Sequence, residues 1–181
     1  MTVMLQRMMR NLRGAAVLGR DGALGALDDL YFDGHCWQVR YVVVATDGAP
    51  HGTRLLVSVA CLARAAMRDR VHVELSRAQI GTGAGAWPLH AAGRWLDRKR
   101  ICSGRDMIGF RIEALDGSAG RLADLLVDEE AWSIEYMMVD SGKTAARELL
   151  VPLDWVSGMD SERRAMRVQR TREQLAEVKA A

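Results

Sequence analysis

The sequence has little cysteine and little proline, with three residues of each in 181. Cys36, Cys61 and Cys102 are odd in number and far apart, and none belongs to a Cys-x-x-Cys pair. This spacing argues against a disulfide framework or a zinc site, because both use cysteines at closer, paired spacings. We expect three free, buried thiols and no bound metal or cofactor.

Long apolar runs are also missing, since none approaches the ~20 residues that cross a bilayer. The first 14 residues scatter Arg7, Arg10 and Arg13 among methionines and lack the unbroken apolar stretch of a signal peptide. With 49% apolar and 27% charged residues, the composition is that of a globular protein. The sequence therefore predicts a folded, cytoplasmic protein without a transmembrane segment.

What the sequence does contain is a repeat. Residues 21–33 read DGALGALDDLYFD and residues 116–128 read DGSAGRLADLLVD, an offset of 95 positions. Ten of 24 positions are identical between 21–44 and 116–139, where average residue usage gives about two. A period this long indicates a duplicated domain and not a solenoid. We predict copy one at 1–80, a linker at 81–107 and copy two at 108–181.

Both copies are rich in short β-branched or aromatic runs bounded by Gly, Asp and Ser, which is the pattern of an all-β fold. The predicted strands lie near 15–20, 24–32, 37–45, 54–60 and 70–75 in copy one, and near 110–115, 119–128, 132–140, 147–152 and 165–170 in copy two. The run TREQLAEVKA, capped by Thr171, predicts a short C-terminal helix, and Ser76 is the matching cap in copy one.

Each copy has an Asp-Gly pair followed three residues later by another glycine: Asp21, Gly22, Gly25, Asp116, Gly117 and Gly120. The pairs predict two-residue type I′ hairpins, whose central residues both need positive φ. The later glycines predict bulges that curl each sheet. We interpret Asp29 and Asp33, which recur in copy two, as partners of backbone N–H groups. The aspartates of 21–33 lack the ligand spacing of a calcium loop.

The segments GRDGALGALDDLYFDGHCWQVRYVVV, RLLVSVACL and VHVELSRAQI resemble a bacterial PRC-barrel domain. That family is named for the cytoplasmic part of the photosynthetic reaction-centre H subunit, and a member forms the C-terminal domain of the ribosome maturation factor RimM. The resemblance covers residues 14–80 and again 109–175, as in the free-standing tandem form. It implies two small tandem β-barrels that serve as adaptor modules.

Catalytic patterns are missing from the sequence. His35, His51, His72 and His90 lie at no ligand or triad spacing, and no Ser or Cys lies in a nucleophile elbow. The glycine-rich run 81–85 lacks the preceding strand and following helix of a phosphate loop. We therefore predict that the protein is not an enzyme.

Charge is unevenly divided, with a net +6 in residues 1–100 and −4 in residues 101–181. The split reflects either drift between duplicates or complementarity, within one chain or between the chains of a homodimer. The residues that we single out for partner contact are Trp87, Trp95, Trp155, Arg98 and Arg100.

The function that we expect is that of a non-enzymatic adaptor or scaffold for a protein partner. Alternatives are an RNA- or ribosome-associated factor and a peripheral component of a photosynthetic or other membrane complex. The arginines are scattered and not interleaved with aromatics, which weighs against RNA.

Overall fold

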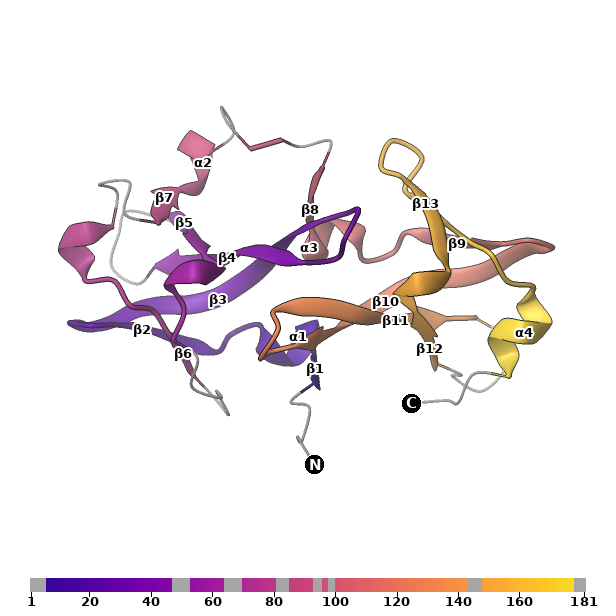
Figure 1. The fold of residues 1–181 in the computed structure, drawn as a ribbon, viewed down its shortest axis with the longest axis horizontal. Helices are drawn as coiled ribbons and strands as arrows, with labels where there is room; N and C mark the ends of the chain where they lie inside the picture. Colours follow the sequence, from indigo (N-terminus) through magenta and orange to yellow (C-terminus); the bar gives the residue numbers. More distant parts are fainter. Residues whose placement is uncertain are drawn as a thin grey trace.

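The computed structural model describes residues 6–46, 53–63, 70–80, 85–92, 96–97, 100–142 and 148–177. Two sheets form two lobes that lie side by side, one built mainly from each half of the chain (Figure 1). The all-β prediction is confirmed, and the helices of the described residues have only three to five residues. None of them is long and apolar enough to span a membrane.

The sheet of the first lobe has the strand order β6-β2-β3-β4-β5-β7, with β8 paired to β3 outside this path. The strands are β2 (Ala16–Gly19), β3 (Gly22–Asp33), β4 (Val39–Thr46), β5 (Arg54–Ser58), β6 (Arg70–His72), β7 (Ala86–Pro88) and β8 (Ile101–Ser103). The helical turns are η1 (Val59–Cys61), η2 (Arg77–Gln79), α2 (Leu89–Ala92) and α3 (Gly104–Met107).

The sheet of the second lobe has the order β12-β11-β10-β9-β14-β13, with β1 paired to β10. The strands are β1 (Gln6–Met8), β9 (Arg111–Ala114), β10 (Gly117–Asp128), β11 (Ser133–Asp140), β12 (Glu148–Pro152), β13 (Val156–Asp160) and β14 (Ala165–Val168). The helical turns are α1 (Met9–Leu12), η3 (Leu153–Trp155) and α4 (Arg172–Ala176).

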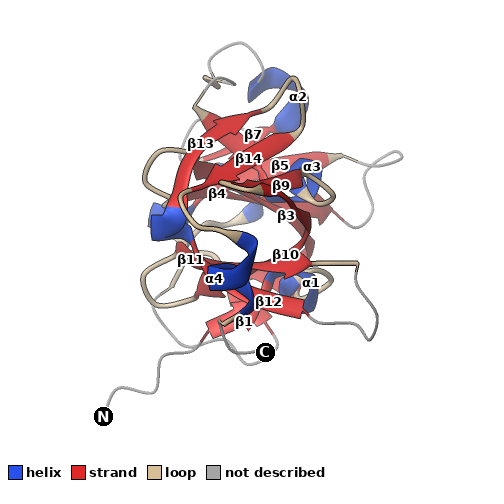
Figure 2. Ribbon diagram, turned by 90° about the vertical axis from the view of Figure 1, so that its right-hand side faces the viewer, coloured by secondary structure: helices blue, strands red, loops and turns tan. Residues whose placement is uncertain are grey.

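Each sheet curls until its two edges approach each other. In the second lobe β12 and β13 stand at opposite ends of the strand order, yet only the three residues of η3 separate them in the chain. In the first lobe Leu62, after η1, forms a bridge with Val73, after β6. The paired strands do not run without a break around either lobe, so each lobe is a curled sheet. Figure 2 shows the strong bend of the long strands.

The two lobes exchange their first strands. Residues 6–12 (β1 and α1), which we call arm one, precede copy one, but β1 pairs with β10 of the second lobe. Residues 101–107 (β8 and α3), which we call arm two, lie 95 positions later, and β8 pairs with β3 of the first lobe. Both arms therefore cross to the opposite lobe, and the repeat extends back to residue 6.

Where the lobes meet, an approximate two-fold axis relates them. Gln38 forms a β-bridge with its own equivalent, Ser133, at the same offset of 95. The N–H of Val39 donates to the carbonyl of Trp132 at 2.7 Å, and the N–H of Ile134 donates to the carbonyl of Trp37 at 2.8 Å. Buried residues of both lobes also belong to one hydrophobic cluster. The two lobes thus share one main hydrophobic core and are related by an approximate internal symmetry.

All ten predicted strands are present, and each end lies within three residues of its predicted position. The sequence did not predict β1, β7, β8 or β13. Three of these four are three-residue strands. β7 and β8 fall inside the predicted linker 81–107, and they pair with β5 and β3 of the first lobe. The predicted helix begins after Thr171, whose hydroxyl accepts the N–H of Gln174 at 3.3 Å.

The prediction of type I′ turns at the Asp-Gly pairs is wrong. Gly19 pairs with Gly22, so Arg20 and Asp21 are the central residues of the first hairpin, and neither has positive φ. Asp21 is needed there for its carboxylate, which accepts the N–H of Arg77 at 3.0 Å. Gly22, with φ of 129°, opens the strand that follows.

In the second hairpin the same arrangement recurs, because the carboxylate of Asp116 accepts the N–H of Arg172 at 2.8 Å. The predicted bulges are confirmed by register shifts next to Gly25 and Gly120. A Cβ on Gly25 would lie 1.9 Å from the carbonyl oxygen of Ala45, and one on Gly120 would lie 2.1 Å from that of Asp140. Only glycine fits this close approach of two backbones.

Candidate functional site

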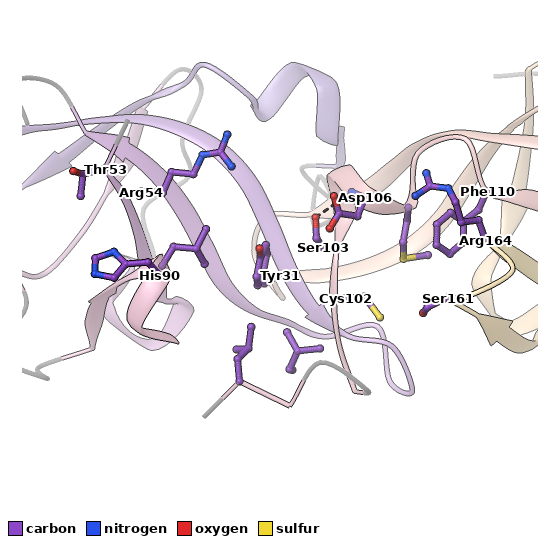
Figure 3. Close-up of a pocket in the computed structure, with 14 residues that line it drawn as sticks. Tyr31, Thr53, Arg54, His90, Cys102, Ser103, Asp106, Phe110, Ser161 and Arg164 are labelled. Carbon is purple, nitrogen blue, oxygen red and sulfur yellow. Dashed lines mark hydrogen bonds between the residues drawn. The ribbon is translucent and has the colours of Figure 1, made fainter. Parts of the chain in front are cut away.

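A groove of about 800 Å3 lies where the two lobes meet (Figure 3). Its walls come from β3, β5, α2 and arm two on one side, and from the turn between β13 and β14 on the other. The lining residues are Tyr31, Thr53, Arg54, Leu89, His90, Leu96, Ile101, Cys102, Ser103, Asp106, Met107, Phe110, Ser161 and Arg164. Because both lobes contribute, the shape of the groove depends on how the arms hold the lobes together.

Several polar groups of the groove are engaged in holding the fold. The hydroxyl of Ser103 donates to Asp29 at 2.6 Å and accepts the N–H of Asp106 at 3.0 Å, which caps α3. The guanidinium of Arg164 lies 4.9 Å from the centre of the Phe110 ring, a cation–π contact. These contacts position the wall and the rim of the groove.

The nucleophile candidates of the groove are poorly prepared for catalysis. Burial, together with the charge of Asp33, raises the pKa of the Cys102 thiol to about 11. At neutral pH this thiol is protonated, and a thiol is a much weaker nucleophile than a thiolate. Ser103 has a carboxylate as its partner, whereas an activated serine usually has an imidazole.

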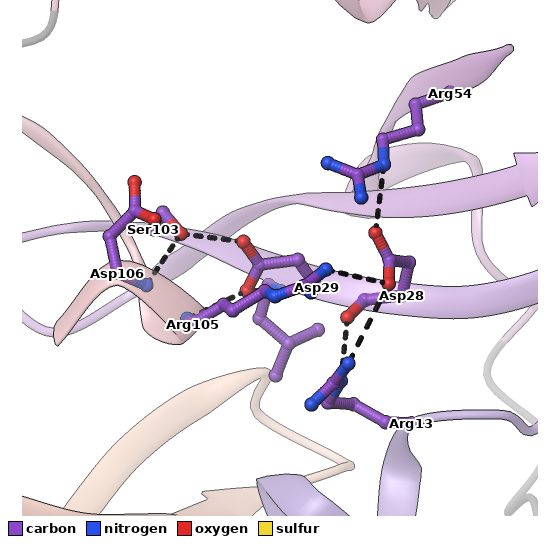
Figure 4. A network of polar contacts seen from close by, with 8 residues as sticks. Arg13, Asp28, Asp29, Arg54, Ser103, Arg105 and Asp106 are labelled. Atoms are coloured by element: carbon purple, nitrogen blue, oxygen red, sulfur yellow. Dashed lines mark hydrogen bonds and ion pairs between the residues drawn. The ribbon is translucent and has the colours of Figure 1, made fainter. Parts of the chain in front are cut away.

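The anchor of arm two is the buried carboxylate of Asp29, which is 5% exposed (Figure 4). One oxygen accepts the N–H of Leu30 at 2.8 Å and that of Arg105 at 3.0 Å, and the other accepts the Ser103 hydroxyl. Burial raises the pKa of Asp29 above its ordinary value, although these hydrogen bonds oppose the rise. The carboxylate joins β3 to the first turn of α3, and a partial positive charge at that helix end favours it.

A register shift in β3 places Asp28 beside this anchor. Leu27 pairs with Val44 and Asp29 with Val43, so Asp28 is the extra residue of a bulge. Three arginines surround its half-buried side chain: the shortest contacts are 3.0 Å to Arg54, 3.2 Å to Arg105 and 3.8 Å to Arg13 (Figure 4). Arg105 belongs to arm two, so this cluster also binds the arm.

The second lobe anchors arm one with the equivalent Asp124, which is 1% exposed. Its carboxylate accepts the N–H of Leu125 at 2.8 Å and that of Arg10 at 3.3 Å. Met8 is the equivalent of Ser103 in this lobe. The Nε of Arg10 lies 3.2 Å from the second carboxylate oxygen of Asp124, but the two groups are not aligned for a hydrogen bond. Arg10 also pairs with Glu148 at 3.6 Å. Burial again raises the carboxyl pKa.

Next to the approximate axis, Trp37 and Trp132 have positive φ, 58° and 50°. A bulky side chain rarely adopts this conformation, which costs of order 1–3 kcal/mol and persists only when the surroundings enforce it. Here both carbonyls accept a hydrogen bond from the opposite lobe, and both rings pack against the common core. The two tryptophans, which begin the predicted strands 37–45 and 132–140, precede β4 and β11, and their carbonyls hold the lobe interface.

The predicted contact residues do not form one site. Trp87 lies on β7, and its ring meets that of Tyr41 edge-on at 6.4 Å. Trp155 lies in η3 under the guanidinium of Arg170, 4.6 Å from the ring centre. The Nε of Arg100 donates to Asp33 at 2.7 Å. Trp95 and Arg98 lie outside the described residues.

The interpretation of Asp29 and Asp33 as partners of backbone N–H groups is confirmed. Asp33 accepts the N–H of His35 at 3.0 Å, and its equivalent Asp128 accepts those of Glu130 and Ala131 at 2.8 and 3.0 Å. In the described residues no group of three His, Cys, Asp or Glu side chains is placed to hold a metal ion.

The sequence reasoning missed Ser103, Arg105 and Arg10, which fell in a predicted linker and in the N-terminal segment. One signal pointed to them, since the identities Arg10/Arg105 and Gly14/Gly109 keep the offset of 95. Comparison of the chain with protein-family models gives no match, and a search among curated proteins finds no relative.

Proposed function

We propose that the chain is a tandem PRC-barrel protein that works as a non-enzymatic adaptor and binds a protein partner in the groove between its lobes. The repeated motifs of residues 14–80 and 109–175 support the family, and so does the curling of each sheet. The tandem arrangement then presents one composite surface instead of two separate modules.

The observation that carries this proposal is the groove itself, built from both lobes and held in shape by the exchanged arms. Its rim bears cationic Arg54 and Arg164 together with anionic Asp106. A surface of mixed sign suits a polypeptide with both charges better than a uniformly anionic nucleic acid. Many arginines outside the groove, such as Arg100 and Arg172, already pair with carboxylates of the chain.

The proposal is tested by site-specific cross-linking in the native cell. A photoreactive amino acid replaces His90, which lies on the groove, and in a matched control replaces Leu115, which is 70% exposed on the β9–β10 turn. We expect His90 to capture a discrete protein that Leu115 does not, with or without ribonuclease treatment. Capture of RNA alone, or equal capture at both positions, contradicts the proposal.

A further inference from the structure

The two copies differ in what covers one edge of the sheet. In the first lobe β7 pairs antiparallel with β5, so that Trp87 lies opposite Leu56 and Pro88 opposite Leu55. The N–H of Ser58 also donates to the carbonyl of Gly85 at 2.8 Å. The equivalent of β5 is β12, and no strand of the described residues pairs with its outer edge.

Apart from this cover, the two edges are closely similar. The apolar residues of β5 recur in β12 at an offset of 94, as Leu149, Leu150 and Val151. Leu56 is 0% exposed beneath the segment that carries β7, whereas Leu150 is only half-buried. Tyr136 of the second lobe is the equivalent of Tyr41, whose ring contacts that of Trp87 in the first lobe. Among the described residues, no aromatic ring contacts Tyr136.

In the part of the chain that the structure describes, no strand pairs with the backbone groups along the outer edge of β12. In antiparallel strands the groups that point to one neighbour alternate along the chain. Ser58 points outward to Gly85, and so its equivalent Pro152 and, two residues earlier, Leu150 point outward too. Pro152 has no N–H, which limits pairing at its end of the strand. Leu150 and Glu148 present the usable donors and acceptors.

The charge beside this edge has also changed sign. Asp140 of β11 lies directly opposite Glu148 of β12, where the first lobe has Ala45 opposite Arg54. Like charges in such a pair destabilise a sheet. Among the described residues Arg10 pairs with Glu148 at 3.6 Å, and it also pairs with Asp124 at 3.2 Å. A cation on an incoming strand would add a favourable contact with Glu148.

We propose that the outer edge of β12 binds an extended segment of a partner protein, antiparallel to β12. An aromatic residue of that segment lies opposite Leu150, as Trp87 lies opposite Leu56. A lysine or arginine two residues later lies opposite Glu148. Strand addition supplies affinity through main-chain hydrogen bonds and specificity through alternate side chains. The proposal rests on the proposed adaptor function only in that the partner is a protein, and it does not depend on the groove.

The test uses the purified full chain and a synthetic peptide with the sequence of residues 84–92 in which arginine replaces Leu89. This peptide copies the chain's own cover strand and places the new cation opposite Glu148. We expect binding by calorimetry and a shift of the Leu150 amide signal in NMR spectra, with the Leu56 amide unchanged. Replacing the peptide's tryptophan by alanine should weaken binding at least 10-fold.

Variants of the protein locate the contact. Glu148→Lys should weaken binding at least 5-fold, and a peptide with glutamate in place of the arginine should restore it. Glu148→Gln, which only removes the charge, gives an intermediate loss, and Leu115→Lys leaves binding unchanged. Thermal melting checks that each variant is folded.

Three results would overturn the proposal: no binding by the peptide, binding insensitive to both Glu148 variants, or a shift at Leu56 instead of Leu150. Self-association of the full chain that Glu148→Lys abolishes would also overturn it, because a second copy would then occupy the edge. A cross-link failure at His90 with intact peptide binding rejects the groove and leaves the β12 edge standing.

Discussion

The two lobes hold their exchanged arms with the same aspartate but with different neighbours. Asp29 and Asp124 each accept the backbone N–H of an arginine at the start of a short helix, Arg105 and Arg10. The second carboxylate oxygen takes a serine hydroxyl in one lobe and faces a guanidinium in the other. The carboxylate on the helix end is therefore the shared requirement, and the partner of its second oxygen is replaceable.

The residues that surround each anchor also differ between the two lobes. Asp28, surrounded by three arginines, becomes Ala123 in the second lobe, and Arg54 becomes Glu148. Because of these two replacements, Arg105 of arm two pairs with Asp28, whereas Arg10 of arm one pairs with Glu148. Ion pairs between the two halves of the sequence thus run in both directions, from Arg105 to Asp28 and from Arg10 to Glu148, and are not a contact between a basic half and an acidic half.

The largest effects should come from the bulge glycines, and they should be equal in the two lobes. Gly25→Ala and Gly120→Ala each force a Cβ against a carbonyl oxygen at positive φ. We expect each to lower the free energy of unfolding by about 3–5 kcal/mol, as backbone strain and overpacking add. Gly22→Ala, where a Cβ has open space, should cost about 1–3 kcal/mol from positive φ alone. Urea unfolding measures all three, and a mild Gly120→Ala beside a severe Gly25→Ala would break the equivalence of the lobes.

Substitutions of Ser103 and Met8, the equivalent residues beside Asp29 and Asp124, should have smaller effects on stability and test how the two anchors differ. Ser103→Ala leaves an oxygen of buried Asp29 without its hydroxyl donor and should cost about 1–3 kcal/mol. For a chain of this size this corresponds to a fall in melting temperature of about 2–4 °C per kcal/mol. Met8→Ser, which offers Asp124 a hydroxyl, should cost less than Ser103→Ala. If Met8→Ser lowers the melting temperature more than Ser103→Ala does, the two anchors are not equivalent.

Opposite pH dependences should separate the anchor aspartate from the turn aspartate of the same lobe. Burial raises the pKa of Asp29 above 3.8, so its contribution to stability is present below that value and lost as the pH rises through its folded pKa. Burial alone would also raise the pKa of Asp33, but the N–H of His35 and the guanidinium of Arg100 hold it below 3.8. Its contribution is present above that value and lost as the pH falls through its folded pKa.

Urea unfolding between pH 3 and 7 measures both slopes. Asp33→Asn should flatten the loss of stability toward acid, and Asp29→Asn should flatten the loss on going from acid to neutral pH. Identical changes of slope in the two variants would show that the environments of these carboxylates do not differ as described.

Salt should have the smallest effect. The pairs Arg105–Asp28 and Arg10–Glu148, which hold the exchanged arms, involve half-exposed arginines, and exposed pairs contribute about 0–1 kcal/mol each. Raising sodium chloride from about 0.15 to 1 M shortens the Debye length from about 8 to 3 Å and weakens such pairs. We expect the free energy of unfolding in urea to change by less than about 1 kcal/mol. A much larger fall would mean that charge, and not the exchanged strands, holds the lobes together.

Strands with a repeated apolar pattern were predictable from the sequence, and so was the partnership of the aspartates with backbone N–H groups. The arms were not, because Gln6–Met8 and Ile101–Ser103 are too short to show a period of two. Their partner strands also lie far away in the sequence, so no local signal marks the pairing. The turn was misjudged at Asp21, since its role depends on Arg77, a residue 56 positions later.

The pairing of Gln6 with Asp128 has a consequence for how the protein is made. A ribosome adds about 5–20 residues per second, so roughly 6–24 seconds pass between the synthesis of these two partners. During that time arm one has no strand to join, and the edge of β3 that receives β8 is open. The first lobe of the nascent chain therefore stays incomplete until Ile101–Ser103, which form β8, have been translated. Assembly between neighbouring chains on one messenger is then a competing route, and the speed of translation through residues 101–128 decides how long that route stays open.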